Sequence, residues 1–211
     1  MSEQSTRWSP DATGSTIDGM AVQVDASLPV HPLTVDDLDA MVRCGILAED
    51  DRVELLDGVL VEMSPQREAH AYAIRELLAR AARVVLESGL RLSVQSPLNV
   101  DSPISRPEPD LAVVPAGGWD AHAARAVLVV EVSVTSRAID LGRKAAIYAA
   151  AGIPDYWVLD IDARRLIVHR DPADDRYATV DALTDDGVVT TARLPLTIAV
   201  AELLPPAPTD R

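Results

Sequence analysis

The sequence is poor in several residue types, and each shortage narrows the class of protein. Phenylalanine is missing, Cys44 is the only cysteine, and no run of about 18 apolar residues occurs. A single cysteine cannot form a disulfide within the chain, and without a long apolar run no membrane partner is expected. The first 20 residues lack the apolar stretch of a secretory signal. We therefore expect a cytoplasmic protein.

Lysine is almost as scarce. Of the 19 basic residues, 18 are arginine and Lys144 is the only lysine. A coding bias that replaces lysine by arginine wherever either is tolerated accounts for this ratio. A lysine that survives such a bias indicates a position that needs a compact ammonium group, although chance survival explains it equally well.

Charge of one sign dominates. The 33 acidic residues give a net charge of -14. Such a chain repels a phosphate backbone at long range, which counts against a protein that simply coats nucleic acid. An enzyme whose acidic site is neutralised by a bound metal ion remains compatible with this charge.

The pattern of apolar residues predicts one domain. The chain has 211 residues, of which 48% are hydrophobic, enough for one folded domain with a core. We expect a mobile tail at 1–32, the folded domain at 33–204 and a short tail at 205–211. The spacing predicts helices over 34–43, 67–88 and 140–151, a hairpin over 52–63 around Asp57-Gly58, and strands over 91–100, 110–114, 127–133, 156–160, 166–170, 177–182 and 187–193. This order indicates an α/β (or α+β) fold with a mixed central sheet flanked by helices.

Three residues are candidates for a catalytic site. Asp110 follows Pro109 at the start of a strand, Glu131 lies within the most apolar strand, and Lys144 is on the following helix. Phosphodiester hydrolysis needs carboxylates for a divalent cation and a positive charge near the transition state. The alternative is structural: Glu131 could form a buried ion pair with an arginine, and Asp110 could simply begin a strand.

The segments around these residues resemble a known family. They are Pro109-Asp110-Leu-Ala-Val-Val, Val-Val-Glu131-Val-Ser133, Asp140-Leu-Gly-Arg-Lys144-Ala-Ala-Ile-Tyr148 and Ala151-Gly-Ile-Pro-Asp-Tyr156-Trp157-Val-Leu-Asp160. Together they are similar to the Uma-two family of restriction endonucleases, a branch of the PD-(D/E)xK nuclease superfamily. Glu54-Leu-Leu-Asp57-Gly58 and His70 also fit, and the resemblance runs from about Leu33 to about Arg170.

The resemblance implies a restriction-endonuclease-like fold and a catalytic centre of Asp110, Glu131 and Lys144. Asp110 and Glu131 would bind Mg²⁺ or Mn²⁺ together with the backbone carbonyl of Val132, and Glu54 would complete the acidic cluster, through water if not directly. The usual lysine two residues after the glutamate is absent, because Ser133 is there. Lys144 on the helix would replace it and would orient or deprotonate the attacking water.

Other residues have weaker claims to the site. His70 fits the family pattern, although a packing role on its helix is equally plausible. Gln95 could point at the site from its strand. Asp140 fits a negative charge at a helix N-terminus, which the helix dipole favours, better than a metal ligand. Cys44 and the pair Tyr156 and Trp157 are expected in the core.

We therefore expect a Mg²⁺- or Mn²⁺-dependent endonuclease acting on DNA, with a homodimer as a possible assembly. One alternative is a catalytically weak nuclease fold used for binding or assembly, which the net charge of -14 favours. Another is a nuclease acting on RNA, since the sequence contains no recognisable readout element.

Overall fold

The computed structural model describes residues 30–117 and 123–206. The described residues from Pro32 onward belong to one compact unit. The expected N-terminal tail lies outside the described residues except for positions 30–32, and so do the last five positions. None of the described helices is both long and apolar enough to cross a membrane.

The described chain contains helices separated by runs of strands. Their order is α1 (Val35–Arg43), β1 (Val53–Leu56), β2 (Val59–Glu62), α2 (Glu68–Glu87), β3 (Leu90–Val94), β4 (Leu98–Asn99), β5 (Leu111–Pro115), β6 (Ala123–Ala124), β7 (Leu128–Ser133), α3 (Arg137–Ile139), the π-helix η1 (Asp140–Lys144), α4 (Ala145–Ala150), β8 (Asp155–Asp160), β9 (Arg165–Ala173), β10 (Arg176–Thr184), β11 (Val188–Thr190), β12 (Thr197–Ala199) and the 3-10 helix η2 (Val200–Glu202).

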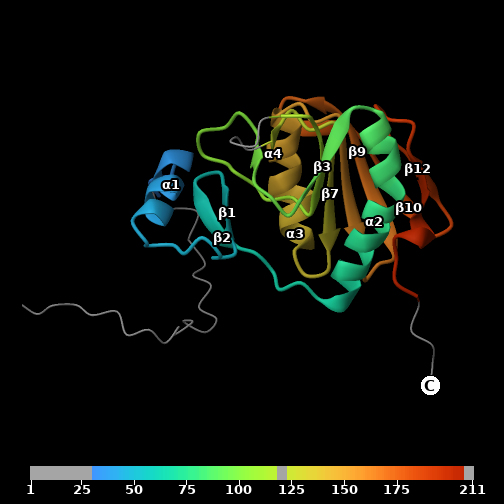
Figure 1. The fold of residues 1–211 in the computed structure, drawn as a ribbon, viewed down its shortest axis with the longest axis horizontal. Coiled ribbons are helices and arrows are strands. Elements are labelled where there is room, and N and C mark those ends of the chain that lie inside the picture. The colour runs from blue at the N-terminus through green and yellow to red at the C-terminus, as the bar shows by residue number, and fades with distance from the viewer. Residues whose placement is uncertain (1–29, 118–122, 207–211) are drawn as a thin grey trace, which may run out of the picture. The chain divides into compact units, whose positions relative to one another are not determined.

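Six strands form the central sheet in the order β10-β9-β8-β7-β5-β3 (Figure 1). The central pair β7 and β8 is parallel, and the other neighbours are antiparallel. Every residue of β7 and β8 is buried, as their continuous apolar sequences predict. Parallel neighbours need a long crossover, which α3, η1 and α4 provide. The expected mixed sheet flanked by helices is thus confirmed.

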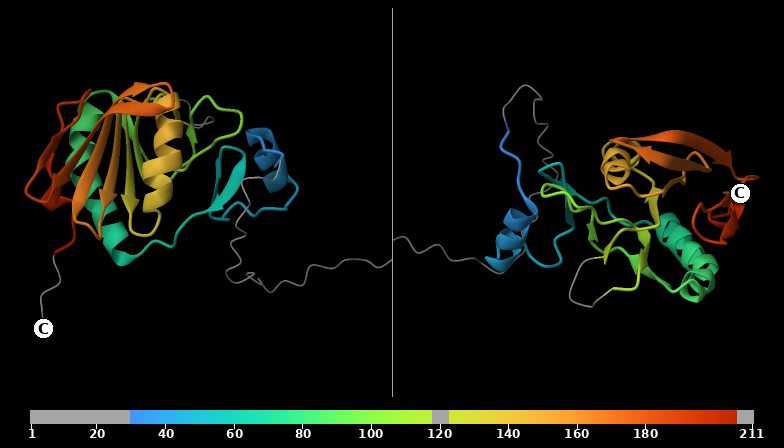
Figure 2. Two further views of the ribbon diagram at one scale, coloured as in Figure 1. Left: turned by 180° about the vertical axis from the view of Figure 1, so that it is seen from behind. Right: turned by 90° about the horizontal axis from the view of Figure 1, so that it is seen from above.

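The sheet is covered on both faces. The view from above shows α2 and α4 on opposite sides of it (Figure 2). Side chains of β7 alternate between two cores: Val130 and Val132 pack with α2, whereas Val129 packs with α4. Alternation turns Glu131 to the face of Val129, and so toward η1 and α4.

The helix–hairpin segment before the sheet follows its local sequence signals. Thr34 and Asp37 form the predicted capping box at α1, with the Thr34 Oγ1 accepting the Asp37 N–H at 3.1 Å. The turn between β1 and β2 has positive φ at Asp57 (50°) and Gly58 (78°), as a type I′ turn requires. A Cβ atom on Gly58 would lie 2.3 Å from the Cβ of Pro32, so this position also needs glycine for space.

Four expectations need correction. The strand expected over 91–100 is split, because Gln95 has a φ of 46° and turns the chain between β3 and β4. The helix expected from Asp140 begins at Arg137 and contains a π-turn. The region near 187–193 continues into a further strand, β12, which pairs with β11. Cys44 is exposed after α1 and does not fill the core.

Candidate active site

Asp110 and Glu131 come together at the point where β5 begins beside β7. Leu111 pairs with Val130 in the antiparallel register, which places Asp110 next to Glu131 on the adjacent strand. Opposed residues on neighbouring strands point to the same face. Both carboxylates are buried, at 8% and 4% exposure, and both line a pocket of about 70 Å³.

Lys144 completes the cluster from the other side. Its Nζ atom lies 3.0 Å from Oε1 of Glu131 and 3.0 Å from Oε2 of Glu54. The ammonium group is therefore held between β7 and β1, and it lines the same pocket. The buried ion pair that was an alternative for Glu131 does exist, but its partner is the chain's only lysine and not an arginine.

Tyr148 is a member of the cluster that the sequence did not single out. Its hydroxyl donates a 2.9 Å hydrogen bond to the same Oε1 of Glu131 that Lys144 contacts. The available signal was its spacing: Tyr148 lies four residues after Lys144, so both side chains leave the helix on one face. Glu131 is thus oriented by two donors from one helix.

Asp110 is fixed by two donors of its own. Its Oδ2 accepts the backbone N–H of Val132 at 2.8 Å, and its Oδ1 lies 2.9 Å from Nε2 of His70. His70 sits in the first turn of α2, on the far face of the sheet, and reaches the site where β5 begins. Of the weaker sequence candidates, His70 is therefore brought into contact with the predicted centre.

The backbone carbonyl of Val132 points to the side of β7 on which Asp110 lies. The carbonyl of Ser133 accepts the N–H of Ile161 on the β8 side. Successive peptide groups of a strand point to opposite sides, and the N–H of Val132 already points to Asp110. The Val132 carbonyl therefore points toward the gap beside Asp110, and Val132 lines the pocket.

The π-turn that carries Lys144 is anchored at its first residue. The Ser136 hydroxyl donates to Oδ2 of Asp140 at 2.5 Å, and the Tyr156 hydroxyl donates to the Asp140 backbone carbonyl at 2.9 Å. Asp140 is 1% exposed and lies one turn inside the helix. Asp140 is thus a buried carboxylate near the start of the helix, and it also lines the pocket.

Burial governs the acid–base behaviour of the cluster. It raises the pKa of Glu131 well above its ordinary value, an effect that the charge of Lys144 opposes. Burial alone would lower the pKa of Lys144, but the carboxylates of Glu131, Glu54 and Asp140 outweigh it and raise the pKa above its ordinary value. The lysine is consequently a protonated ammonium at neutral pH.

The oxygen atoms of the pocket fit a hard divalent cation. Carboxylates and backbone carbonyls are the ligands that Mg²⁺ and Mn²⁺ prefer, and Asp110, Glu131 and Val132 supply both kinds. No group of three or more His, Cys, Asp or Glu side chains within the described ranges is already arranged around one metal position. Binding of a cation would therefore require some of the side chains in the pocket to change their present positions.

Gln95 is not brought to the site. It does not line the pocket, and its backbone N–H donates to the backbone carbonyl of Asp110 at 3.2 Å. Its contribution is to the backbone turn that precedes β5, so the prediction of a side chain pointing into the site has no support from its position.

The architecture is that of a nuclease fold. A crystal structure described as a putative nuclease belonging to DUF820, from Anabaena variabilis, aligns with a TM-score of 0.64 over 82% of this chain and 97% of that chain, at 16% identity. Residues 35–201 match the family described as "Uma2: Putative restriction endonuclease", and the chain belongs to this family. No curated protein matches it.

Proposed function

We propose that the protein is a divalent-metal-dependent endonuclease that hydrolyses phosphodiester bonds of DNA. The observation that carries the proposal is the convergence of Asp110, Glu131 and Lys144, from three separate elements, on one pocket. Membership of the family and the nuclease fold support nuclease activity in general.

The proposed roles follow from the contacts. Asp110 and Glu131 would hold the cation together with the Val132 carbonyl; when bound, it supplies water activation and neutralises charge on the phosphate. His70 would hold Asp110 in place through the 2.9 Å contact. Glu54 contacts Lys144 directly at 3.0 Å, so we assign it to positioning the ammonium group.

Lys144 would act as a cation and a hydrogen-bond donor. Two carboxylates hold it protonated, so it is poorly suited to accept a proton from water. A fixed ammonium beside the scissile phosphate would orient the attacking water and stabilise the negative charge of the transition state. Of the two roles that the resemblance implied, orientation is the one that the geometry favours.

The test is cleavage of plasmid DNA with Mg²⁺ or Mn²⁺, with and without a chelator. We expect cleavage only with metal, and a loss of about 10²–10³-fold in kcat for Lys144→Ala, typical of removing one transition-state donor. Asp110→Asn, which keeps the side-chain shape, should be equally impaired. Arg143→Ala is the matched control, because Arg143 lies next to Lys144 on η1 but does not line the pocket.

Undiminished cleavage by a folded Lys144→Ala protein would refute its role. Metal binding by calorimetry without cleavage of any DNA or RNA would favour the alternative of a binding or assembly module, which the net charge of -14 motivates. Faster cleavage of RNA than of DNA would reassign the substrate. Cutting both strands of a duplex in one binding event would need two copies of this pocket, and light scattering across a concentration series tests for such a dimer.

A further inference from the structure

Two arginines at the pocket differ from most others in the chain. Arg52 and Arg67 line the pocket and are exposed. Nine of the described arginines pair with a carboxylate: Arg80, Arg83, Arg106, Arg137, Arg143, Arg164, Arg165, Arg170 and Arg176. Neither Arg52 nor Arg67 has such an ion pair with any described residue. In a chain with 33 acidic residues, two unpaired guanidinium groups at one pocket are available for an external anion.

The two arginines lie at opposite ends of the short segment 63–67, with Arg52 beside its first residue and Arg67 as its last. The carbonyl of Arg52 accepts the N–H of Met63 at 2.9 Å, where the chain leaves β2, and Arg67 is the residue just before α2. Four residue steps span at most about 14 Å between Met63 and Arg67. Phosphates of one duplex strand follow each other every ~3.4 Å along the axis. Because Arg52 is hydrogen-bonded to Met63, the same limit applies approximately to the distance between Arg52 and Arg67. The two side chains can therefore contact different phosphates of one strand.

The segment between the arginines is tied to the catalytic end of β7. The Thr135 hydroxyl donates to the Ser64 hydroxyl at 3.0 Å, and both residues line the pocket. This contact links the rim to the loop that follows Glu131 and Val132. Phosphates held by Arg52 and Arg67 would consequently lie close to a phosphate placed at Asp110.

Charge makes such contacts necessary. Six acidic residues line the pocket, namely Glu54, Glu62, Glu108, Asp110, Glu131 and Asp140. Lys144 already forms ion pairs with two of them, Glu54 and Glu131. Arg52 interacts at longer range with Glu108: burial raises the pKa of this carboxyl group, and the charge of Arg52 acts in the opposite direction. A polyanion that approaches this acidic chain needs local cations at the rim.

We propose that Arg52 and Arg67 bind backbone phosphates close to the scissile one, without reading the base sequence. This inference rests on the proposed nuclease function. It assigns to the two arginines the capture of the DNA strand, and leaves the chemistry to the residues inside the pocket. Arginine suits this task, because its planar fork matches two phosphate oxygens at once.

The experiment measures the affinity of the full chain for a fluorescein-labelled duplex by anisotropy across a salt series, with Ca²⁺ in place of Mg²⁺. A gel after each titration checks that the duplex is intact. Arg52→Gln and Arg67→Gln should each weaken binding about eightfold at 0.1 M salt and lower the slope of log affinity against log salt by about 0.9, as expected for one lost contact to B-DNA.

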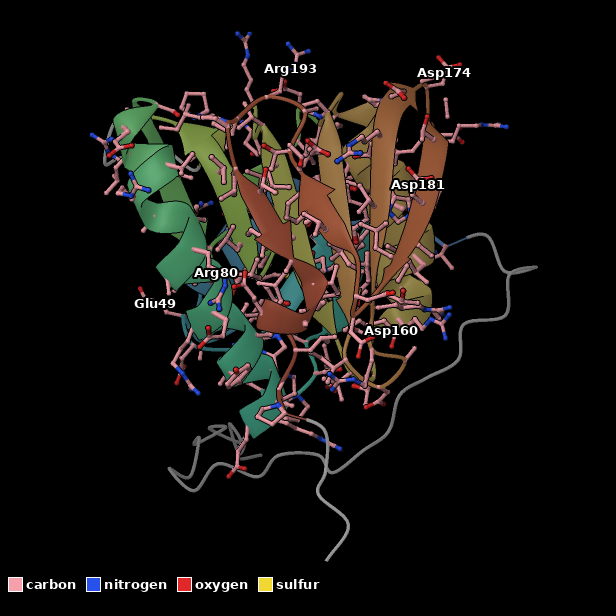
Figure 3. The ribbon with its side chains drawn as sticks, turned by 90° about the vertical axis from the view of Figure 1, so that its right-hand side faces the viewer. Glu49, Arg80, Asp160, Asp174, Asp181 and Arg193 are labelled. Carbon is pink, nitrogen blue, oxygen red and sulfur yellow. The ribbon has the colours of Figure 1, made fainter. Side chains whose placement is uncertain are left out.

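Arg193→Gln is the matched control, because it removes the same charge at a distant place. Arg193 is exposed in the turn between β11 and β12. Figure 3 shows it at the opposite end of the sheet from Asp160, which pairs with Ser133 at the pocket end of β7. If the pocket variants keep the affinity and salt slope of Arg193→Gln while the wild type binds and cuts DNA, the inference is overturned and the nuclease function stands. If the wild type neither binds nor cuts DNA, both fall.

Discussion

Tyr156→Phe tests how the π-turn that carries Lys144 is held in place. It removes one oxygen atom from a fully buried ring, and with it the 2.9 Å hydrogen bond to the Asp140 carbonyl at the start of the π-turn. A neutral buried hydrogen bond contributes about 1 kcal/mol to stability. In a domain of this size that corresponds to a fall in Tm of about 2–4 °C, measurable by calorimetry or circular dichroism.

The larger effect should be on catalysis. Tyr156 does not line the pocket, so substrate binding should be unchanged, but the turn it anchors carries Lys144 four residues later. A misplacement of about 1 Å at a reacting group can cost about 10²-fold in rate. We therefore expect kcat for DNA cleavage to fall by about 10- to 100-fold with KM unchanged.

Tyr177→Phe separates this positioning role from a general loss of stability. The Tyr177 hydroxyl is also buried and donates at 2.9 Å to a backbone carbonyl, that of Ile153, and its ring lies 6.2 Å from the ring of Tyr156. Ile153 follows α4 and is remote in the chain from Lys144. Tyr177→Phe should lower Tm similarly and keep kcat. Equal kcat values for the two variants would refute the reasoning.

Three other predictions concern stability. Thr34→Ala removes the cap of α1 and should cost about 1 kcal/mol, seen as a shift in the urea midpoint at constant slope; an unchanged midpoint would show that α1 contributes little to the cooperative unit. Gly58→Ala places a Cβ at positive φ against Pro32 and should cost about 1–3 kcal/mol, whereas Gly45→Ala, at positive φ but in open space, should cost less. Burial lowers the pKa of His169, so the unfolded chain binds more protons than the folded one, and stability should fall as the pH drops from 7 to 5. The Tm of His169→Phe should therefore depend less on pH over that range than the Tm of the wild type. Parallel plots of Tm against pH for the two proteins would contradict this.

The elements that the sequence predicted well are those with local signals. The capping box at Thr34, the turn at Asp57-Gly58 and the apolar run of β7 each depend on residues a few positions apart. The family resemblance named both Asp110 and Glu131, and the pairing of β5 with β7 places the two residues next to each other. The short pairs of β4 with β6 and of β11 with β12 lack comparable periodicity.

The remaining features depend on contacts between distant segments. No local pattern shows that His70 on α2 reaches past the sheet to Asp110, or that Glu54 on β1 meets Lys144. The π-turn was hidden for the same reason, since one of its two anchors is the Tyr156 hydroxyl on the distant strand β8. A hydrophobic pattern likewise does not reveal where the hydroxyl of Tyr148 points.

The isolation of Lys144 gives the protein a built-in chemical reporter. Apart from the terminal amine, it carries the only primary amine of the chain, and the residue is 4% exposed, with its amine in contact with two carboxylates. An amine-reactive reagent can modify it only in molecules in which β1, β7 and the helix have separated. Mass spectrometry of pulse-labelled protein would thus read the opening rate of the pocket directly, from a single residue and without any engineered probe.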